Sequence, residues 1–130
     1  MWVSQSRSQR AKVSAILRYW KEERGWKSPG YHRIIKPSGE IVKLSSFDKP
    51  TNGVRGYNNN SIHISYIGGL GGKDNRTEEQ KASILGCIHE ALRYEGTSDD
   101  VEIKGHRDFP GVTKYCPSFD AKKEYKWSLA

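Results

Sequence analysis

Cysteines and long apolar runs are scarce in this sequence, and each scarcity excludes a class of protein. The two cysteines, Cys87 and Cys116, are too few for the disulfide framework of a small secreted scaffold, so we expect a reducing compartment. No run of 18 apolar residues occurs, which predicts no membrane insertion. The first residues, Met-Trp-Val-Ser-Gln-Ser-Arg, lack the apolar segment of a secretory signal, so we expect cytoplasmic synthesis.

Internal repeats, low-complexity tracts and domain boundaries are also absent from the sequence. A chain of 130 residues has the size of one domain, so residues 1–130 are expected to fold around one core. The 22 Lys and Arg residues outnumber the 15 Asp and Glu residues, and the net charge of +7 favours polyanionic partners. Nucleic acid, acidic lipid and bacterial wall all qualify, and charge alone does not choose among them because the basic residues form no block.

Two segments have the periodicity of amphipathic helices. Between Arg10 and Gly25 an apolar stripe recurs at i, i+3, i+4 and i+7, and the glycine is expected to end the helix. The residues of this stripe are Val13, Ile16, Leu17 and Trp20. A second helix is expected to begin at a capping box of Thr77 and Gln80 and to end at Gly96. Its buried stripe is Leu85, Ile88 and Leu92.

The remaining segments have the composition of strands and loops. Residues 31–35 and 40–44 flank a turn and predict a hairpin, while residues 61–67 and 101–104 predict two further strands. Residues 47–60 are rich in Pro, Gly and Asn, which predicts a long ordered loop. The fold class is therefore expected to be α/β: a single domain with a mixed, mostly antiparallel β-sheet flanked by α-helices.

The carboxyl-terminal part of the chain contains an imidazole and a thiol that could share a metal ion. His106 and Cys116 are ten residues apart across a loop that contains Pro110 and Gly111. Both side chains are zinc ligands in proteins. On this spacing alone, two structural residues would be the more frequent finding, so the zinc interpretation needs further support.

That support comes from motifs spread along nearly the whole chain. They are Gly30-Tyr31-His32, Gly56-Tyr57-Asn58 through Ser61-Ile62, Gly105-His106-Arg107-Asp108, and Cys116-Pro117-Ser118-Phe119-Asp120. In combination they resemble the zinc-dependent N-acetylmuramoyl-L-alanine amidases of the phage-lysozyme and peptidoglycan-recognition-protein type. The resemblance implies an enzyme that uses a zinc-activated water to hydrolyse the amide between N-acetylmuramic acid and L-alanine in peptidoglycan.

The same resemblance implies roles for individual residues. His106 and Cys116 correspond to two ligands of the Zn²⁺ cofactor, Tyr31 to a catalytic partner near the metal, and Lys114 to a stabiliser of the oxyanion. A phenol such as that of Tyr31 can donate a hydrogen bond or relay a proton without being ionised.

The resemblance also implies a partner and a place of action. Peptidoglycan is the expected partner, and we expect a monomer that binds no specific nucleic acid. For Tyr57, Asn58 and Asn60 two interpretations stay open: a polar groove for the muramyl peptide, or a turn that uses the tolerance of asparagine for left-handed geometry. Phage or prophage lysis is the expected context, with release to the wall through a holin or a similar route.

One expected zinc ligand is missing from the pattern. In the family a first histidine ends an amino-terminal strand, and here the corresponding position falls at or beside Trp2, whose indole nitrogen only donates hydrogen bonds. The strand itself is expected to be nearly absent, which would make this domain N-terminally shortened. Three explanations stay open: a start further upstream, a naturally shortened relative, or substitution by another histidine.

Three other histidines could substitute for the missing ligand, and we assign none of them. His32 follows Tyr31 and is expected on the opposite strand face, which favours a structural role. His63 shares a strand face with Ser65 and could approach a cleft, although half-exposure is the more frequent finding. His89 is expected at the boundary of a helix. Because of the missing ligand, a catalytically impaired relative that binds peptidoglycan fragments or a protein partner is the alternative function.

Overall fold

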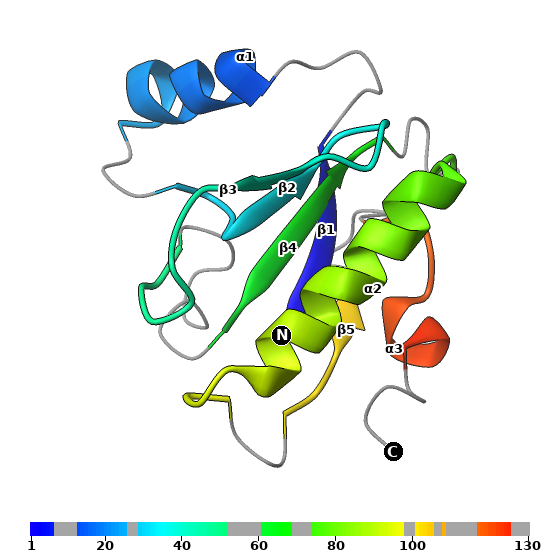
Figure 1. Ribbon diagram of the computed structural model, residues 1–130. Coiled ribbons are helices and arrows are strands. Elements are labelled where there is room, and N and C mark those ends of the chain that lie inside the picture. Colours follow the sequence, from blue (N-terminus) through cyan, green and yellow to red (C-terminus); the bar gives the residue numbers. More distant parts are fainter. Residues whose placement is uncertain are drawn as a thin grey trace.

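The computed structural model describes residues 1–6, 13–25, 29–51, 61–68, 74–97, 101–105, 108 and 117–125. These residues form one five-stranded sheet with helices on both faces (Figure 1). The strand order is β3-β2-β4-β1-β5. In Figure 1, α1 lies over one face of the sheet, and α2 and α3 lie over the other. A single α/β domain with a mixed sheet, as predicted, is therefore confirmed.

The direction of the strands differs from the prediction. β1 (Trp2–Ser6) pairs in parallel with β4 (His63–Ile67) and with β5 (Lys104–Gly105), and β2 (Arg33–Ile35) also pairs in parallel with β4. Among the described strands, the one antiparallel pairing joins β2 to β3 (Ile41–Lys43) in the predicted hairpin. The expectation of a mostly antiparallel sheet was wrong. Helices lie in the connections between β1 and β2 and between β4 and β5, and such crossover connections allow strands to run in the same direction.

The amino-terminal strand, expected to be nearly absent, is present in the interior of the sheet. β1 lies between β4 and β5, and its Val3 side chain is fully buried. The expectation failed because Ser4-Gln5-Ser6 has no apolar alternation that would mark a strand. Backbone hydrogen bonds to two neighbours, which no local sequence pattern records, hold the segment in place.

The first helix is formed in two parts. α1 (Val13–Arg18) continues as a π-helical segment, η1 (Tyr19–Glu23), and Gly25 follows with φ +66°. Gly25 therefore ends the helix as predicted. Trp20 is buried against Ile34 and Ile67, whereas Leu17 is 39% exposed and does not belong to the buried stripe. Val13 and Ile16 are partly buried against the same cluster, so the buried stripe is narrower than predicted.

The second helix, α2 (Glu78–Arg93), begins at the predicted capping box. The Thr77 hydroxyl accepts a hydrogen bond from the Gln80 amide, and the Gln80 side-chain oxygen accepts one from the Thr77 amide, both at 3.0 Å. The helix ends before the predicted Gly96, and the Thr97 hydroxyl instead caps it by donating to the Ala91 carbonyl at 2.6 Å. The final strand is also displaced, from 101–104 to β5 at Lys104–Gly105.

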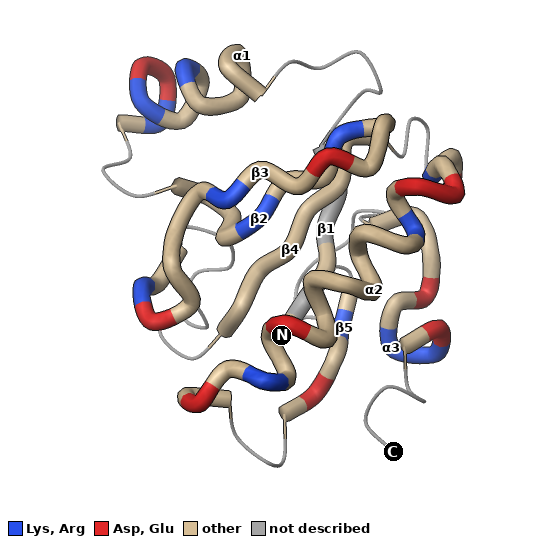
Figure 2. Tube along the Cα trace, viewed as in Figure 1, with Lys and Arg blue, Asp and Glu red and all other residues tan. Residues whose placement is uncertain are grey.

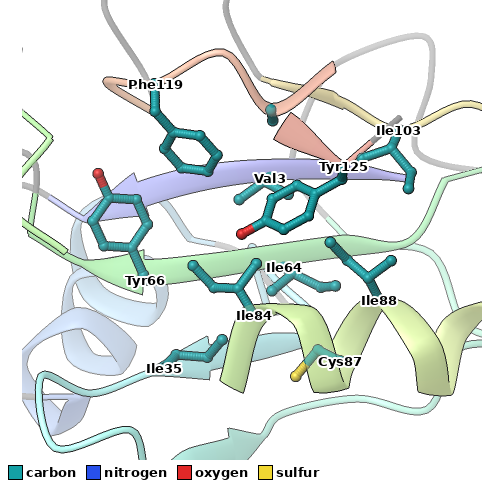
Figure 3. Close-up of a cluster of buried hydrophobic side chains, with 11 residues drawn as sticks. Val3, Ile35, Ile64, Tyr66, Ile84, Cys87, Ile88, Ile103, Phe119 and Tyr125 are labelled. Atoms are coloured by element: carbon teal, nitrogen blue, oxygen red, sulfur yellow. The ribbon is translucent and has the colours of Figure 1, made fainter. Parts of the chain in front are cut away.

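The main core lies between the sheet and the α2 and α3 layer (Figure 3). Its buried residues are Val3, Ile35, Ile64, Tyr66, Ile84, Cys87, Ile88, Ala91, Ile103, Phe119, Ala121 and Tyr125. Burial raises the pKa of the Cys87 thiol to about 11, so Cys87 is the small buried apolar residue that its helical position predicts.

A buried arginine attaches the carboxyl-terminal helix to this core. α3 (Ala121–Glu124) contributes Glu124, whose carboxylate accepts two hydrogen bonds from Arg76 at 2.7 and 2.8 Å. Arg76 also donates to Asp74 at 2.8 Å and lies 3.4 Å from the ring centroid of Phe119. The guanidinium is thus bound by two carboxylates and one aromatic face.

The charged residues are distributed as the sequence predicts, without a block of one sign. Figure 2 shows basic and acidic residues interspersed along the described elements rather than gathered by sign. Within the part of the chain that the structure describes, no helix combines the length and the apolar character needed to cross a bilayer.

Candidate active site

Three aromatic rings meet where β2 and β4 begin. Tyr31 lies two residues before β2, and its ring contacts that of His63, the first residue of β4, with centroids 4.4 Å apart and planes at 89°. The Trp20 ring of η1 contacts the other side of Tyr31 at 5.1 Å. The parallel pairing of β2 with β4 therefore brings two residues 32 positions apart into edge-to-face contact. The Trp20 ring of η1 packs against the phenol ring as well.

His63 is buried, and its Nδ1 atom is protonated. Its side chain is 1% exposed, so the expectation of a half-exposed histidine was wrong: β4 has a strand on each edge and a helix layer on each face. The Nδ1 atom lies 2.9 Å from the Gly30 carbonyl oxygen. Because a carbonyl only accepts hydrogen bonds, Nδ1 carries a proton and donates it to this bond.

His32 has the structural role that its strand position predicts. Its Nδ1 accepts a hydrogen bond from the backbone amide of His63 at 2.9 Å, and its Nε2 donates to the Lys49 carbonyl at 2.7 Å. Burial lowers the pKa of His32, which keeps the ring neutral as these two bonds require. Both nitrogens are engaged, so His32 has no lone pair to offer a metal.

The position expected for the missing ligand lies at the same end of the sheet. In the β1–β4 pairing, Trp2 is the register partner of His63, and in the β1–β5 pairing it is the partner of Lys104. Position 2 therefore lies between the first residues of two neighbouring parallel strands. The sequence pattern alone does not reveal this register, because it joins residues far apart in the chain.

Tyr31 is the one predicted site residue within the described ranges. The predicted metal ligands His106 and Cys116 lie outside the described residues, as does Lys114. The predicted substrate-binding residues Tyr57, Asn58 and Asn60 also lie outside them. Within the described ranges, no three His, Cys, Asp or Glu side chains come together in a way that could hold a metal ion.

The residues next to the two predicted ligands are described, and they touch. Gly105 precedes His106 in the chain, and Pro117 follows Cys116. A Cβ atom added to Gly105 would come within 2.7 Å of the Pro117 Cδ atom, so this approach requires a glycine. The Tyr66 hydroxyl donates to the Pro117 carbonyl at 2.6 Å, which anchors this segment to β4. The donor types on either side of the contact, an imidazole and a thiol, fit zinc chemistry.

A buried hydroxyl adds polarity to the strand that carries His63. Ser65 is two residues further along β4 and is fully buried, and its hydroxyl has no hydrogen-bond partner within the described structure. Leaving such a group unsatisfied costs about 1–3 kcal/mol. The Ser65 hydroxyl therefore lowers the stability of the folded chain.

Comparison with known families agrees with this arrangement. The family model described as N-acetylmuramoyl-L-alanine amidase matches residues 3–119. The chain belongs to this amidase family. Among curated relatives of this amidase-family chain, the endolysin of Enterobacteria phage K11 is 35% identical over 114 residues, which are 85% of this chain and 72% of the endolysin.

Solved structures confirm the fold of this amidase-family domain. The N-acetylmuramoyl-L-alanine amidase LysC from Clostridium intestinale superimposes with a TM-score of 0.77 at 21% identity, over 98% of this chain and 82% of LysC. Peptidoglycan recognition protein-LE, solved in complex with tracheal cytotoxin, superimposes with a TM-score of 0.82 at 17% identity, over 99% of this chain and 79% of that protein. An amidase and a recognition protein therefore share this fold.

Proposed function

We propose that this chain is a zinc-dependent amidase that hydrolyses the bond between N-acetylmuramic acid and L-alanine in peptidoglycan. Membership of the amidase family and the similarity to a phage endolysin support an amidase acting on the wall. The contact of Gly105 with Pro117 carries the proposal for the site, because it joins the two chain segments next to His106 and Cys116.

In this proposal, the His106 imidazole and the Cys116 thiolate hold zinc. When bound, zinc supplies a Lewis acid that lowers the pKa of a water molecule toward neutrality and polarises the scissile carbonyl. The Tyr31 phenol, whose ring contacts Trp20 and His63, would donate a hydrogen bond to the reacting group. Lys114, two residues before Cys116, supplies a cation for the negative charge that develops on the carbonyl oxygen.

We further propose that Tyr57, Asn58 and Asn60 supply polar contacts to the muramyl peptide. The net charge of +7 would favour approach to an anionic bacterial wall. The domain would act there as a monomer, once it is released to the wall.

The test is release of amino groups from purified peptidoglycan, because hydrolysis frees the amino group of L-alanine without freeing reducing sugar ends. With one equivalent of zinc, the chain is expected to release amino groups, and a chelator is expected to stop release. His106→Asn and Cys116→Ser should each abolish it, while Lys114→Met should lower the rate about 100- to 1000-fold. His89→Gln, in α2, is the matched histidine control and should leave the rate unchanged.

A second candidate function is peptidoglycan binding without hydrolysis. It is favoured by Trp2 at the position of a family ligand and by the fold shared with a recognition protein solved with a peptidoglycan fragment. Co-sedimentation with insoluble wall separates the two functions. A chain that sediments with wall but releases no amino groups at stoichiometric zinc would establish binding and contradict the amidase proposal.

A further inference from the structure

We propose that His63 is a positioning residue, which holds the Tyr31 phenol in the orientation that the amidase reaction needs. This inference rests on the proposed function, because Tyr31 takes part in the chemistry only in that proposal. Tyr31 lies outside the strands and its side chain is partly buried, so neighbouring side chains determine where its ring points. The contacts of His63 with this segment carry the inference.

His63 contacts three consecutive residues of the segment that contains Tyr31. Its Nδ1 atom donates to the Gly30 carbonyl at 2.9 Å. Its ring meets the Tyr31 ring edge to face, with centroids 4.4 Å apart. Its backbone amide donates to Nδ1 of His32 at 2.9 Å, and its carbonyl accepts from the His32 amide at 2.8 Å. The chain on both sides of Tyr31 and the Tyr31 ring are therefore attached to the same residue of β4.

A histidine meets two requirements at this position that an apolar residue would not meet together. His63 is 1% exposed, and Gly30 is buried as well. An apolar side chain would fill the space beside Tyr31 but would remove the donor to the Gly30 carbonyl. A buried carbonyl that loses its donor costs about 1–3 kcal/mol. The imidazole supplies both a flat ring for the edge-to-face contact and an N–H for the carbonyl.

His63 is itself fixed firmly enough to orient a second ring. It belongs to β4, which has β1 on one edge and β2 on the other. The His32 ring, which accepts from the His63 amide, is fixed in turn by donating to the Lys49 carbonyl at 2.7 Å. A displacement of about 1 Å near a reacting group can cost about 100-fold in rate, so an anchored phenol matters for turnover.

Steady-state kinetics on soluble muropeptides, with one equivalent of zinc, provide the first test. His63→Asn keeps an N–H near the position of Nδ1 and removes the ring, so kcat should fall about 10- to 100-fold with KM changed less than about twofold. His63→Phe keeps a ring and removes the donor to Gly30, and it should show the same split between kcat and KM. His89→Gln, a helical histidine of α2, is the control and should match wild type.

A double variant distinguishes a positioning residue from one that only stabilises the fold. Tyr31→Phe removes the hydroxyl and should lower kcat about 100-fold or more. If His63 acts through the phenol, adding His63→Asn to Tyr31→Phe should lower kcat further by less than about twofold. A residue whose only effect is on stability would lower the rate by the same factor in both backgrounds.

The outcomes separate this inference from the proposed function. If wild type releases no amino groups, the proposed function fails and this inference fails with it. If wild type is active but the His63 variants keep its kcat, or slow the Tyr31→Phe chain as much as they slow wild type, the positioning role is wrong and the amidase proposal stands.

NMR of the wild-type chain covers the case in which the His63 variants do not fold, and it does not depend on activity. With ¹³C-labelled tyrosine, the ring signal lost in Tyr31→Phe identifies Tyr31 among the 7 tyrosines. Its ring protons should be shifted by the neighbouring rings and should show cross-relaxation with the His63 ring. Signals at the ordinary tyrosine positions, without that cross-relaxation, would overturn the inference.

Discussion

His32 and His63 contact each other, yet their backbone partners suit them to different tasks. The His32 ring bridges two strands and the Lys49 carbonyl, and both nitrogens are used. The His63 ring donates from Nδ1 to the Gly30 carbonyl and contacts the Tyr31 ring. The difference arises from which backbone group each ring meets, because the side chains are chemically identical.

Cys87 provides a prediction at the residue scale. Burial raises the pKa of its thiol to about 11, so little thiolate forms at neutral pH and reaction with a thiol reagent should be very slow in the folded chain. With zinc removed by a chelator, mass spectrometry should find one fast label, on Cys116, and a second only after denaturation. Equal labelling rates for both cysteines in the folded chain would contradict this burial.

The same shift predicts a loss of stability in alkali. A raised folded pKa means that the unfolded chain releases the thiol proton first, so the contribution of Cys87 is fully present below about pH 9 and declines as pH rises toward 11. Cys87→Ala should show a smaller decline in unfolding free energy across this interval, as measured by urea denaturation at several pH values.

At the scale of elements, α3 depends on a charged side chain from outside it. Arg76 precedes α2 in the chain and holds Glu124 of α3 together with Asp74, while its guanidinium covers the Phe119 ring. A helix of four residues cannot stabilise itself in water, so these contacts and the core residues Ala121 and Tyr125 determine its place.

Replacing Arg76 should therefore detach this helix. Arg76→Met should lower the free energy of unfolding by about 2–4 kcal/mol, because it leaves two carboxylates without their shared partner and removes the contact with Phe119. Urea denaturation measures the change, and Arg93→Met, at the exposed end of α2, is the matched control with an expected change below about 0.5 kcal/mol.

Acid should reveal the same contact. Hydrogen bonds from Arg76 lower the pKa of both Asp74 and Glu124. Their contribution is present above the unfolded pKa values, near 4, and is lost as pH falls through the lower folded values. Wild type should lose more stability than Arg76→Met between pH 5 and pH 3, and parallel pH profiles would show that the contact is unimportant.

At the scale of the whole molecule, the main core and the aromatic contact between Tyr31 and His63 lie on opposite faces of the sheet. The main core lies between the sheet and α2, whereas Tyr31 and His63 lie on the α1 side. A chain of this size buries enough surface to fold without a metal. Removing zinc should therefore affect stability without unfolding the domain.

Mass action gives the expected size of the stabilisation by zinc. Zinc at 100 times its Kd should stabilise the folded chain by about 2.7 kcal/mol, which corresponds to roughly 10 °C in Tm for a domain of this length. Calorimetry with and without a chelator measures this shift, and far-UV circular dichroism should be unchanged at 25 °C. Magnesium, which prefers oxygen ligands, should not replace zinc; an equal shift with magnesium would contradict a nitrogen and sulfur site.

The sequence by itself determined the features that depend on neighbours along the chain. The capping box at Thr77, the glycine end at Gly25 and the hairpin across 36–39 are local, because each is decided by hydrogen bonds or dihedral angles within a few residues. The amidase motifs also identified the family. Burial of Cys87 followed from its place in a helix.

Only the tertiary structure decided which segments lie side by side. The interior place of β1 and its parallel pairing with β4 and β5 join positions as many as 102 residues apart, and no local pattern records such pairings. Strand pairing consists of backbone hydrogen bonds, which every residue except proline can make, so the side chains of Ser4-Gln5-Ser6 do not reveal their neighbours. For the same reason, the contact of Tyr31 with His63 emerges only once the sheet is assembled.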